Sequence, residues 1–583
     1  MKFEELSVYL NDLEKTPSRL EITRILAELF SKSEVDEIDK IVYLILGSLA
    51  PSYKNIVFNL AERMMVEVLA KAYNEKKAKI SAMYLEEGDL GSLASRLTLN
   101  SKNKTPTVQA GKDAKLSVTD VYNKLLELAE DGGEKSVERK IESMASLLSE
   151  LDPQSARFVT RIPIGRLRLG FSDKTILDAL SWMEVGGKEK KAKLETAYNI
   201  LPDVGLLAKE VKKYGIDKAV KRISPKIGIP TLPMLAQRLK SPKEMIKKMG
   251  TVSVEPKFDG LRIQIHFKRD GFEDGTFVKA FTRNLNETSW MFPELSALKE
   301  FCNAKELILD SEAVGIDEGR RKMANFQTTM TRRRKYDIEN IASKVSIKFY
   351  VFDIIFKDGE SYMDRTYEQR RGELAKAVKS GKLLQIVDYE ITTKPERIIE
   401  LMKKNLKEGL EGVLVKKKDS KYVAGRTGWR WVKMKEDESA KAKLADTVDC
   451  VVMGYSAGRG KRVSFGIGQF LVGVRDGDEI KTVTKVGTGL TDDQFRELNK
   501  RLADIKTKEK PKNYVVNKLL EPDFWVIPEV VVEIAADEIT KSPNHTSGLA
   551  LRFPRLVKFR DDRSAEDATN ITELTSIFGL QKA

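Results

Sequence analysis

The sequence predicts a multidomain protein in which an all-α N-terminal domain precedes an α+β domain and a small β-barrel. Three observations predict this fold class. The first 224 residues have the apolar period of helices, prolines punctuate residues 225–233, and short alternating strands follow. A chain of 583 residues is also too long for one hydrophobic core. We therefore predict domains at residues 1–224, 225–436 and 437–583.

The helical prediction rests on individual segments of the first domain. Ser18-Arg-Leu-Glu21 has capping-box spacing and opens an amphipathic segment. The apolar residues on one face of that segment are Ile22, Ile25, Leu26, Leu29 and Phe30. A second amphipathic run covers residues 57–72, whereas the polar residues 99–117 have no period and predict a loop. Helical signals resume at Val118 and again after Ser172.

Pro225, Pro230 and Pro233 mark the boundary between the first and second domains. A residue that precedes proline avoids the helical conformation, so the helical pattern ends here and the strands of the second domain follow. The segments with the strand pattern are residues 262–267, 306–310, 347–352 and 412–416. Helical segments lie between them, which indicates an α+β domain. A charged stretch at residues 433–446 leads to a third region, whose strands and glycine turns predict a small barrel.

Composition narrows the classes of partner and cofactor. A net charge of +15 favours an anionic partner, with nucleic acid as the leading candidate. Two cysteines support no disulfide framework, and two histidines cannot complete a zinc site without carboxylates. A catalytic metal is then expected to be a hard ion such as Mg²⁺. No apolar run reaches the roughly 18 residues of a membrane span, and the N-terminus lacks the pattern of a signal peptide, so we expect a cytoplasmic protein.

Lys257 is the candidate catalytic residue. It lies in Val254-Glu-Pro-Lys-Phe-Asp-Gly-Leu-Arg262, within a turn bounded by Pro256 and Gly260. On its own, such a segment is more often a surface turn with an exposed Lys–Asp pair. An uncharged lysine amine, however, can attack phosphorus, and burial together with neighbouring cations such as Arg262 favours the uncharged form.

Other segments favour a nucleotidyl-transfer site over a surface turn. Glu312 is predicted at the end of an apolar strand, Phe352 is an aromatic that could stack on a base, and Glu411 adds a second carboxylate. Lys433 and Lys435 alternate on a strand and therefore project from one face. Each residue alone fits a solvated strand or a packed core. Paired carboxylates that hold Mg²⁺ and paired lysines that grip a triphosphate are together expected of nucleotidyl transfer.

In their order, these motifs resemble those of the covalent nucleotidyltransferases, specifically the ATP-dependent DNA ligases of the archaeal and eukaryotic replicative type. Residues 257–262 resemble the KxDGxR motif, and Phe281-Thr-Arg283 resembles the arginine motif that follows it. The remaining nucleotide-site motifs match residues 310–312, 352–353, 411–412 and 431–435. The resemblance implies an adenylation domain at residues 225–436.

The resemblance also implies a role for each matching residue. Lys257 would carry AMP, while Glu255 through its backbone and Phe352 by stacking would hold adenine. Glu312 and Glu411 would assist the metal. The residues expected to contact the ribose or the phosphates are Arg262, Arg283, Glu312, Lys433 and Lys435.

Similar motifs lie outside the predicted adenylation domain. Residues 156–170 resemble the signature of the helical DNA-binding domain of these ligases, so Arg161, Arg166 and Arg168 are expected to contact DNA phosphates. Residues 542–546 and 551–555 resemble the C-terminal OB-fold domain. The RxDK motif matches residues 560–563, so Arg560 and Arg563 would orient pyrophosphate.

Two positions depart from the family pattern. The RxDK motif ends in Arg563, which keeps the charge of the usual lysine but changes the donor geometry. Thr427 stands where the family has an arginine, and Arg426 lies one residue earlier. We expect Arg426 to contact the nucleotide, with its role left open.

The resemblance implies a DNA ligase that seals nicks through a lysine–AMP intermediate and 5′-adenylated DNA, in replication, recombination and repair. ATP and Mg²⁺, or Mn²⁺, are the expected cofactors. Nicked duplex DNA is the expected partner of a nucleoid-associated monomer, and a sliding clamp is a further expected partner, although no convincing clamp-binding peptide occurs. Whether ADP or GTP can replace ATP stays open.

Other classes of protein fit less well. An mRNA-capping guanylyltransferase or an RNA ligase shares the KxDG chemistry, but the helical domain and residues 156–170 argue against both. A DNA-binding scaffold with a decayed site would not need to keep its lysines and glutamates. An NAD⁺-dependent ligase usually carries a four-cysteine zinc module, which two cysteines cannot build.

Overall fold

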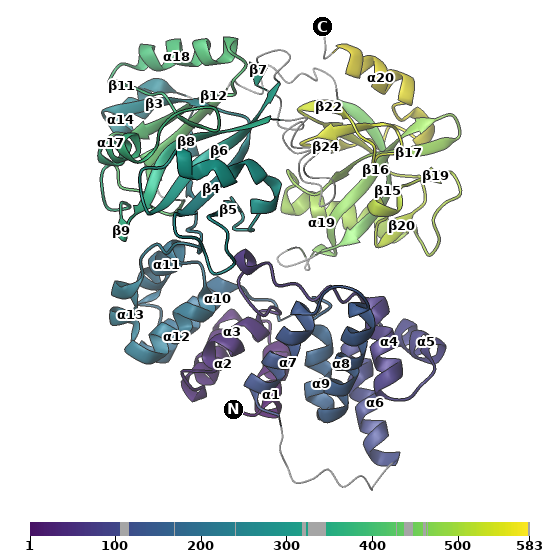
Figure 1. Ribbon diagram of the computed structural model, residues 1–583. Coiled ribbons are helices and arrows are strands. Elements are labelled where there is room, and N and C mark those ends of the chain that lie inside the picture. The colour runs from purple at the N-terminus through teal and green to yellow at the C-terminus, as the bar shows by residue number, and fades with distance from the viewer. Residues whose placement is uncertain are drawn as a thin grey trace. The chain divides into compact units, whose positions relative to one another are not determined.

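The computed structural model describes residues 1–104, 116–167, 169–239, 241–317, 322–323, 346–426, 428–435, 447–458, 462 and 465–580. The chain divides into two compact units, Met1–Met434 and Lys435–Ala583. The first unit contains a helical region followed by an α+β region, and the second is built mainly from strands (Figure 1). Among the described helices, none has both the length and the apolar character needed to cross a membrane.

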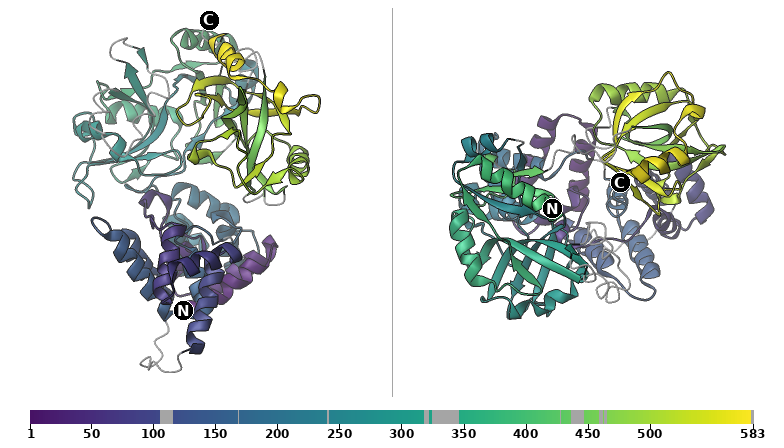
Figure 2. Two further views of the ribbon diagram at one scale, coloured as in Figure 1. Left: turned by 90° about the vertical axis from the view of Figure 1, so that its right-hand side faces the viewer. Right: turned by 90° about the horizontal axis from the view of Figure 1, so that it is seen from above.

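The helical region packs around one hydrophobic cluster that runs from Phe3 to Ala219. Its helices form a single block, coloured purple to blue in Figure 1 and Figure 2. They are α1 (Phe3–Lys15), α2 (Arg19–Lys32), α3 (Ile38–Ile45), α4 (Glu62–Ala72), α5 (Lys77–Glu87), α6 (Leu90–Lys104), α7 (Val118–Glu130), α8 (Ser136–Glu150), α9 (Pro153–Arg161), α10 (Asp173–Val185), α11 (Lys191–Ile200), α12 (Val204–Tyr214) and α13 (Ile216–Arg222).

The predicted starts of three helices are confirmed. Ser18 caps α2 by accepting a hydrogen bond from the backbone N–H of Glu21 at 3.4 Å. Ser117 and Asp120 form a full capping box at the start of α7. Helix α10 begins directly after Ser172. The apolar face predicted for α2 is buried, with Ile25 only partly covered.

Two boundaries in the helical region were predicted wrongly. Helix α4 begins at Glu62 rather than at residue 57, because Asn59 has a φ of 51°, a left-handed conformation that a helix cannot contain. Helix α6 continues to Lys104, so the predicted loop does not begin at Leu99. Polar residues at an exposed helix end need no apolar period. The rest of that predicted loop, residues 105–115, lies outside the described residues.

Two sheets form the described α+β region. The seven-stranded sheet has the order β10-β8-β6-β4-β5, and β7 and β9 pair with β6 and β8. Its strands are β4 (Leu261–Lys268), β5 (Val278–Thr282), β6 (Glu306–Asp317), β7 (Lys322–Met323), β8 (Ser346–Lys357), β9 (Glu360–Ser361) and β10 (Leu384–Ile386). The five-stranded sheet has the order β11-β3-β12-β14-β2. Its strands are β2 (Gln237–Arg238), β3 (Val252–Lys257), β11 (Glu390–Thr392), β12 (Gly412–Lys417) and β14 (Trp431–Lys435).

Three hydrophobic clusters organise this region. One joins the smaller sheet to helices α14 (Pro242–Met249) and α18 (Pro395–Lys407). Another joins the larger sheet to helix α17 (Tyr367–Ala377). The third takes side chains from both sheets, including Ile308 of β6, Phe352 of β8 and Trp431 of β14. The two sheets therefore face each other across this third cluster. A short pair, β1 (Met234–Leu235) and β13 (Gly425–Arg426), completes the described strands of the region.

The second unit has its own sheet and core. The strand order is β18-β20-β15-β16-β17-β19, with β21 pairing both β15 and β24, and β22 and β23 pairing separately. The strands are β15 (Val448–Ala457), β16 (Ile467–Asp476), β17 (Glu479–Val486), β18 (Lys506–Thr507), β19 (Tyr514–Val515), β20 (Phe524–Val526), β21 (Val531–Ala535), β22 (Glu538–Lys541), β23 (Leu549–Arg552) and β24 (Arg555–Phe559). Helices α19 (Asp492–Ala503) and α20 (Ile571–Leu580) contribute Leu498, Leu502 and Leu574 to its core.

Candidate active site

The strand register brings two of the predicted site residues together. Lys257 ends β3 and lies opposite Gly412, the first residue of β12. Glu411 precedes Gly412, and its backbone N–H donates to the carbonyl oxygen of Lys257 at 3.0 Å. Residues far apart in sequence are therefore neighbours at one end of the smaller sheet.

The side chain of Lys257 is paired with a carboxylate. Its Nζ forms an ion pair with Glu411 and lies 3.3 Å from the carbonyl oxygen of Phe258. The sequence suggested cationic neighbours, but the guanidinium of Arg262 is paired elsewhere, with Asp310. The turn after Lys257 needs glycine at position 260, because a Cβ there would lie 2.5 Å from the carbonyl oxygen of Ala313.

Arg262 belongs to a closed network of buried polar groups. Its Nε and Nη2 donate to Asp310 at 2.9 and 2.6 Å, and its Nη1 donates to the carbonyl oxygen of Met234 at 2.7 Å. The Tyr422 hydroxyl donates to Asp310 at 2.9 Å and accepts from the backbone N–H of Met234 at 3.1 Å. Burial alone would lower the pKa of Arg262, but the charge and hydrogen bonds of Asp310 outweigh burial and raise it.

Glu312 lies opposite Arg262 in the register of β6 and β4. The prediction that it ends a strand was wrong, because β6 continues to Asp317 and pairs with strands on both sides. Burial raises the pKa of Glu312 to about 7, although Lys257 and Arg262 act in the opposite direction. A carboxyl group in such surroundings is stabilised as an anion by any further cation.

The carboxylates predicted for a metal fit a shared site. Glu411 is one of the groups that raise the pKa of Glu312, so the two carboxylates act on each other electrostatically. Among the described residues, no cluster of three or more His, Cys, Asp or Glu side chains could hold a metal ion alone. Mg²⁺ is commonly held by one or two carboxylates together with substrate phosphates. The donor set therefore fits Mg²⁺ shared between the protein and a triphosphate.

Glu255 and Phe352 are both buried, on different sheets. Glu255 is 1% exposed, and its Oε2 lies 2.7 Å from Nζ of Lys416. The ring of Phe352 is 5% exposed and packs edge-on against Trp431 at a centroid distance of 6.0 Å. Lys416 Nζ lies 4.6 Å from the Phe352 ring centre, which makes it a link between the two predicted base contacts.

Sequence reasoning missed Lys416, although a signal was present. It is a fully buried lysine that directly follows the apolar residues Val413, Leu414 and Val415 in β12. A buried lysine needs an anionic partner, so this position indicated a charge on a neighbouring strand. Burial lowers the pKa of Lys416, and Glu255 opposes that effect.

The predicted strand face of Lys433 and Lys435 is confirmed. Val432 and Met434 pack into the cluster beneath α14 and α18, and Trp431 packs into the cluster between the sheets. Because side chains alternate along a strand, the two lysines share the face of Trp431.

Arg283 follows β5 and lines a small cavity with Arg262 and Asp310. Its other lining residues are Pro230, Thr231, Pro233, Gln264, Phe281 and Thr282. This cavity brings the arginines of the two neighbouring motifs to one place. Arg426 is described only as part of strand β13, and Thr427 lies outside the described residues.

The remaining nucleotide-site candidates lie in the second unit. Arg560 donates both to Asp562, at 2.7 and 2.9 Å, and to Asp449, at 2.9 and 3.0 Å. Arg563 also reaches Asp449, at 2.9 Å. Hydrogen bonding to Asp562, with the nearby charge of Asp449, raises the pKa of Arg560.

The three arginines predicted to bind DNA differ in their surroundings. Arg161 is 4% exposed and is paired with Asp89 at 2.8 Å and with Glu14 at 2.9 Å. Such a buried guanidinium is not free to reach a phosphate, so its role in helix packing is the one that the contacts support. Arg166 is exposed and lies 2.9 Å from Glu62. Arg168 lies outside the described residues.

One cavity of the described residues is lined by none of the predicted site residues, although its lining residue Thr569 accepts a hydrogen bond from the backbone N–H of Asp449, the partner of Arg560. This cavity has a volume of about 630 Å³ and lies in the second unit, between the β16–β17 turn and α20. Its charged lining side chains are Arg475, Asp476 and Glu573.

Comparison with known proteins gives matches along almost the entire chain. Residues 2–181 match the family model "DNA ligase N terminus". Residues 233–435 match "ATP dependent DNA ligase domain", and residues 464–563 match "ATP dependent DNA ligase C terminal region". The motif residues from Glu255 to Lys435 all fall within the second match.

Similar proteins extend over the full length. A probable DNA ligase of Dictyoglomus thermophilum is 39% identical over 594 residues, covering 100% of this chain and 98% of that protein. A DNA ligase of Sulfolobus acidocaldarius is 36% identical over 596 residues, covering 99% and 98%. A solved structure titled "Pmar-Lig_Pre." has 20% identity and a TM-score of 0.54, covering 95% of this chain and 99% of that one, which indicates a similar fold.

Proposed function

The chain belongs to the family of ATP-dependent DNA ligases, and from that premise we propose that Lys257 takes AMP from ATP and passes it to the 5′-phosphate of a nick. The family uses ATP and acts on DNA, which implies the sealing of nicks. The observation that carries the proposal for Lys257 is the contact of its Nζ with Glu411, close enough to the half-buried Glu312 to influence its pKa.

In the first step the Nζ of Lys257 attacks the α-phosphorus of ATP. A P–N bond forms, the bond between the α-phosphorus and the bridging oxygen breaks, and pyrophosphate leaves. Before the attack, the Lys257 ammonium gives one proton to the Glu411 carboxylate that contacts Nζ, and the second proton, lost as the P–N bond forms, leaves with the pyrophosphate. Lys433, Lys435 and Arg283 neutralise the charge on the phosphates. When bound, Mg²⁺ held by Glu312 and Glu411 would add positive charge at the same oxygens.

In the second step an oxygen of the 5′-phosphate at the nick attacks the phosphorus of the lysine adduct. The P–N bond breaks, Lys257 is released, and a pyrophosphate linkage joins AMP to the DNA. The 3′-hydroxyl then attacks the 5′-phosphorus, AMP leaves and the backbone is continuous again. Most of the acceleration comes from positioning and charge neutralisation.

The remaining residues take the roles that the family resemblance assigns. Glu255 and Phe352 hold adenine, while Arg262 and Arg426 contact the nucleotide. Arg560 and Arg563 orient pyrophosphate. Because the guanidinium of Arg161 is buried, we do not assign this residue to the DNA-binding surface of the protein. Arg166 and Arg168 remain assigned to that surface.

The domain roles are also part of the proposal. Residues 1–224 bind duplex DNA, residues 225–436 carry out adenylation, and residues 437–583 form an OB-fold. The paired strands of the second unit support the last assignment. The protein acts as a monomer in replication, recombination and repair, with a sliding clamp as partner.

The test is transfer of label from ATP. Wild type, Lys257→Ala and a control, Lys243→Ala on the exposed surface of α14, are incubated with Mg²⁺ and α-labelled ATP and separated by denaturing electrophoresis. We expect the label on wild type and control and its complete loss in Lys257→Ala. A labelled Lys257→Ala would show that another residue is the nucleophile.

The same labelled protein identifies the substrate. It is offered a nicked DNA duplex, an RNA substrate and no acceptor. We expect transfer of AMP and sealing with nicked DNA alone. Transfer only to RNA would favour the RNA-ligase class instead.

A further inference from the structure

Helix α17 buries three polar side chains in addition to Leu374 and Ala377, which is unusual because helices normally bury apolar side chains. Tyr367, Arg370 and Arg371 have the spacing of neighbours on one face. Tyr367 and Arg370 are fully buried, and Arg371 is 4% exposed. The helix begins with a capping box between Thr366 and Gln369, so its first turn, which carries Tyr367, is held in place.

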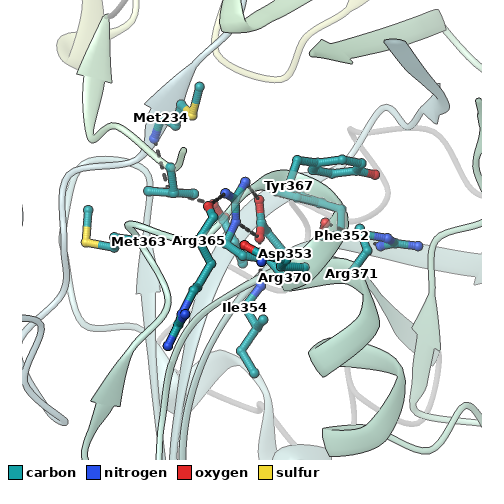
Figure 3. A network of polar contacts seen from close by, with 12 residues as sticks. Met234, Phe352, Asp353, Ile354, Met363, Arg365, Tyr367, Arg370 and Arg371 are labelled. Atoms are coloured by element: carbon teal, nitrogen blue, oxygen red, sulfur yellow. Dashed lines mark hydrogen bonds and ion pairs between the residues drawn. The ribbon is translucent and has the colours of Figure 1, made fainter. Parts of the chain in front are cut away.

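Arg370 holds Asp353, the residue that follows Phe352 in β8. Its Nε and Nη2 donate to the two oxygens of Asp353 at 2.7 and 2.9 Å, in a fully buried pair (Figure 3). Its Nη1 donates to the carbonyl oxygens of Arg365 and Ser420 at 2.8 and 3.0 Å. Every nitrogen of the guanidinium is therefore engaged, and the fork geometry leaves one orientation for Asp353.

Arg371 holds the backbone of Phe352 itself. Its Nη1 donates to the carbonyl oxygen of Phe352 at 3.3 Å, and its Nη2 donates to the carbonyl oxygen of Val387. Figure 3 shows Arg370 and Arg371 on α17 with Asp353 and Phe352 beside them. The helix thus contacts β8 at the carbonyl oxygen of Phe352 and at the side chain of Asp353.

Tyr367 reaches the other sheet. Its hydroxyl donates to the carboxylate of Glu255 on β3 and accepts from Ser253 at 3.2 Å. Burial, reinforced by the negative charge of Glu255, raises the pKa of Tyr367 well above its ordinary value. The phenol therefore keeps its proton and remains a donor to Glu255.

One face of α17 thus contacts both sheets at the two residues that we assign to adenine. We propose that Tyr367, Arg370 and Arg371 are positioning residues that set the spacing between Glu255 and Phe352, and thereby the fit of the base. This inference rests on the proposed function. Buried ion pairs contribute little net stability compared with apolar packing, so their value here is geometric.

The decisive variant is Tyr367→Phe, which removes one oxygen and keeps the ring. Tyr514→Phe is the matched control, because Tyr514 is equally buried and donates to a backbone oxygen of Val526 at 2.9 Å, in the second unit. The initial rate of lysine labelling is measured in the full-length protein over a range of ATP concentrations. We expect the half-saturating ATP concentration of Tyr367→Phe to rise about tenfold, with the rate at saturation within about threefold of wild type.

The ratio of labelling with ATP to labelling with inosine triphosphate gives a second readout, which depends on the base. We expect this ratio to fall in Tyr367→Phe and to stay unchanged in Tyr514→Phe. A variant that only loses stability would label more slowly at every ATP concentration, with an unchanged half-saturation and ratio. That result would overturn the inference.

Arg371→Lys tests the Phe352 side of the same helix. Lysine keeps the charge, but its single nitrogen cannot hold the two carbonyl oxygens that the guanidinium spans. We expect the same rise in half-saturating ATP as in Tyr367→Phe, and an ATP dependence like that of wild type would contradict the proposal. Failure of the proposed function is distinguishable, because the wild-type protein itself would then take no label.

Discussion

Buried charges near the site occur in close pairs. Arg370 and Asp353 are both fully buried, and Lys416 and Glu255 are 0% and 1% exposed. Taking such groups out of water is costly, and the cost is recovered only while both partners are present. Removing one partner should therefore be far more harmful than removing both.

A double-mutant comparison at Arg370 and Asp353 tests this reasoning. We expect Arg370→Met to lower the free energy of unfolding by about 3–5 kcal/mol, because Asp353 is left as an uncompensated buried charge. Arg370→Met combined with Asp353→Leu should recover most of that loss. Denaturant unfolding followed by far-UV circular dichroism measures both. A single variant within about 1 kcal/mol of wild type would contradict the expectation.

His266 should make the free energy of unfolding depend on pH. Its Nδ1 accepts from the backbone N–H of Gly228 at 3.0 Å, so Nε2 carries the proton and donates to Gln264 at 2.9 Å. Burial, helped by the charge of Lys279, lowers the pKa of His266 to about 3. Both ring nitrogens are thus used by the neutral form, and a second proton would break the bond from Gly228.

The sign of the pH effect follows from that lowered pKa. Below the ordinary value of about 6.5 the unfolded chain takes up a proton that the folded chain refuses. Stability should therefore fall by about 1.4 kcal/mol per pH unit as the pH drops from about 6.5 towards 3. His266→Gln should flatten this part of the curve, measured by denaturant unfolding at several pH values. Parallel curves for the two proteins would rule out His266 as the source.

At the scale of elements, the sequence predicted the strands correctly where their apolar periodicity is strong. The strands around residues 262–267, 306–310, 347–352 and 412–416 are present, because each pairs on both sides and buries its apolar face. The start of α4 was missed because a single left-handed residue, Asn59, has no periodic signature. The true end of β6 was missed because its pairing partners lie far away in sequence.

The close approach of α6 and α9 gives a prediction about packing. Gly91 lies where α6 crosses α9, and a Cβ there would be 2.6 Å from the carbonyl oxygen of Arg157 and equally close to the side chain of Arg161. Gly91→Ala should lower the free energy of unfolding by about 1–3 kcal/mol through this overlap. Gly132→Ala is the control, since only one atom lies within 4 Å of its Cβ position, at 3.9 Å. Equal unfolding curves for the two variants would contradict the predicted overlap.

At the scale of the whole molecule, sequence motifs indicated which residues matter but not how they are paired. Lys257 and Glu411 meet only because β3 and β12 are neighbours, a long-range pairing that no local pattern encodes. The role of Tyr367 was likewise hidden, because its partner Glu255 lies 112 residues away in sequence. The order of the motifs was therefore enough to predict which residues form the site, whereas the distances between them follow from the strand register.

The charge of the entire chain gives the last prediction. With 102 lysines and arginines against 87 aspartates and glutamates, binding to duplex DNA should release counterions from many phosphates. We expect affinity for nicked DNA to fall by about a hundredfold or more between roughly 50 and 200 mM salt, as measured by fluorescence anisotropy. Labelling of Lys257 by ATP involves far fewer charges and should change much less over that range, which makes it the internal control. An affinity independent of salt would mean that DNA is held by contacts other than its phosphates.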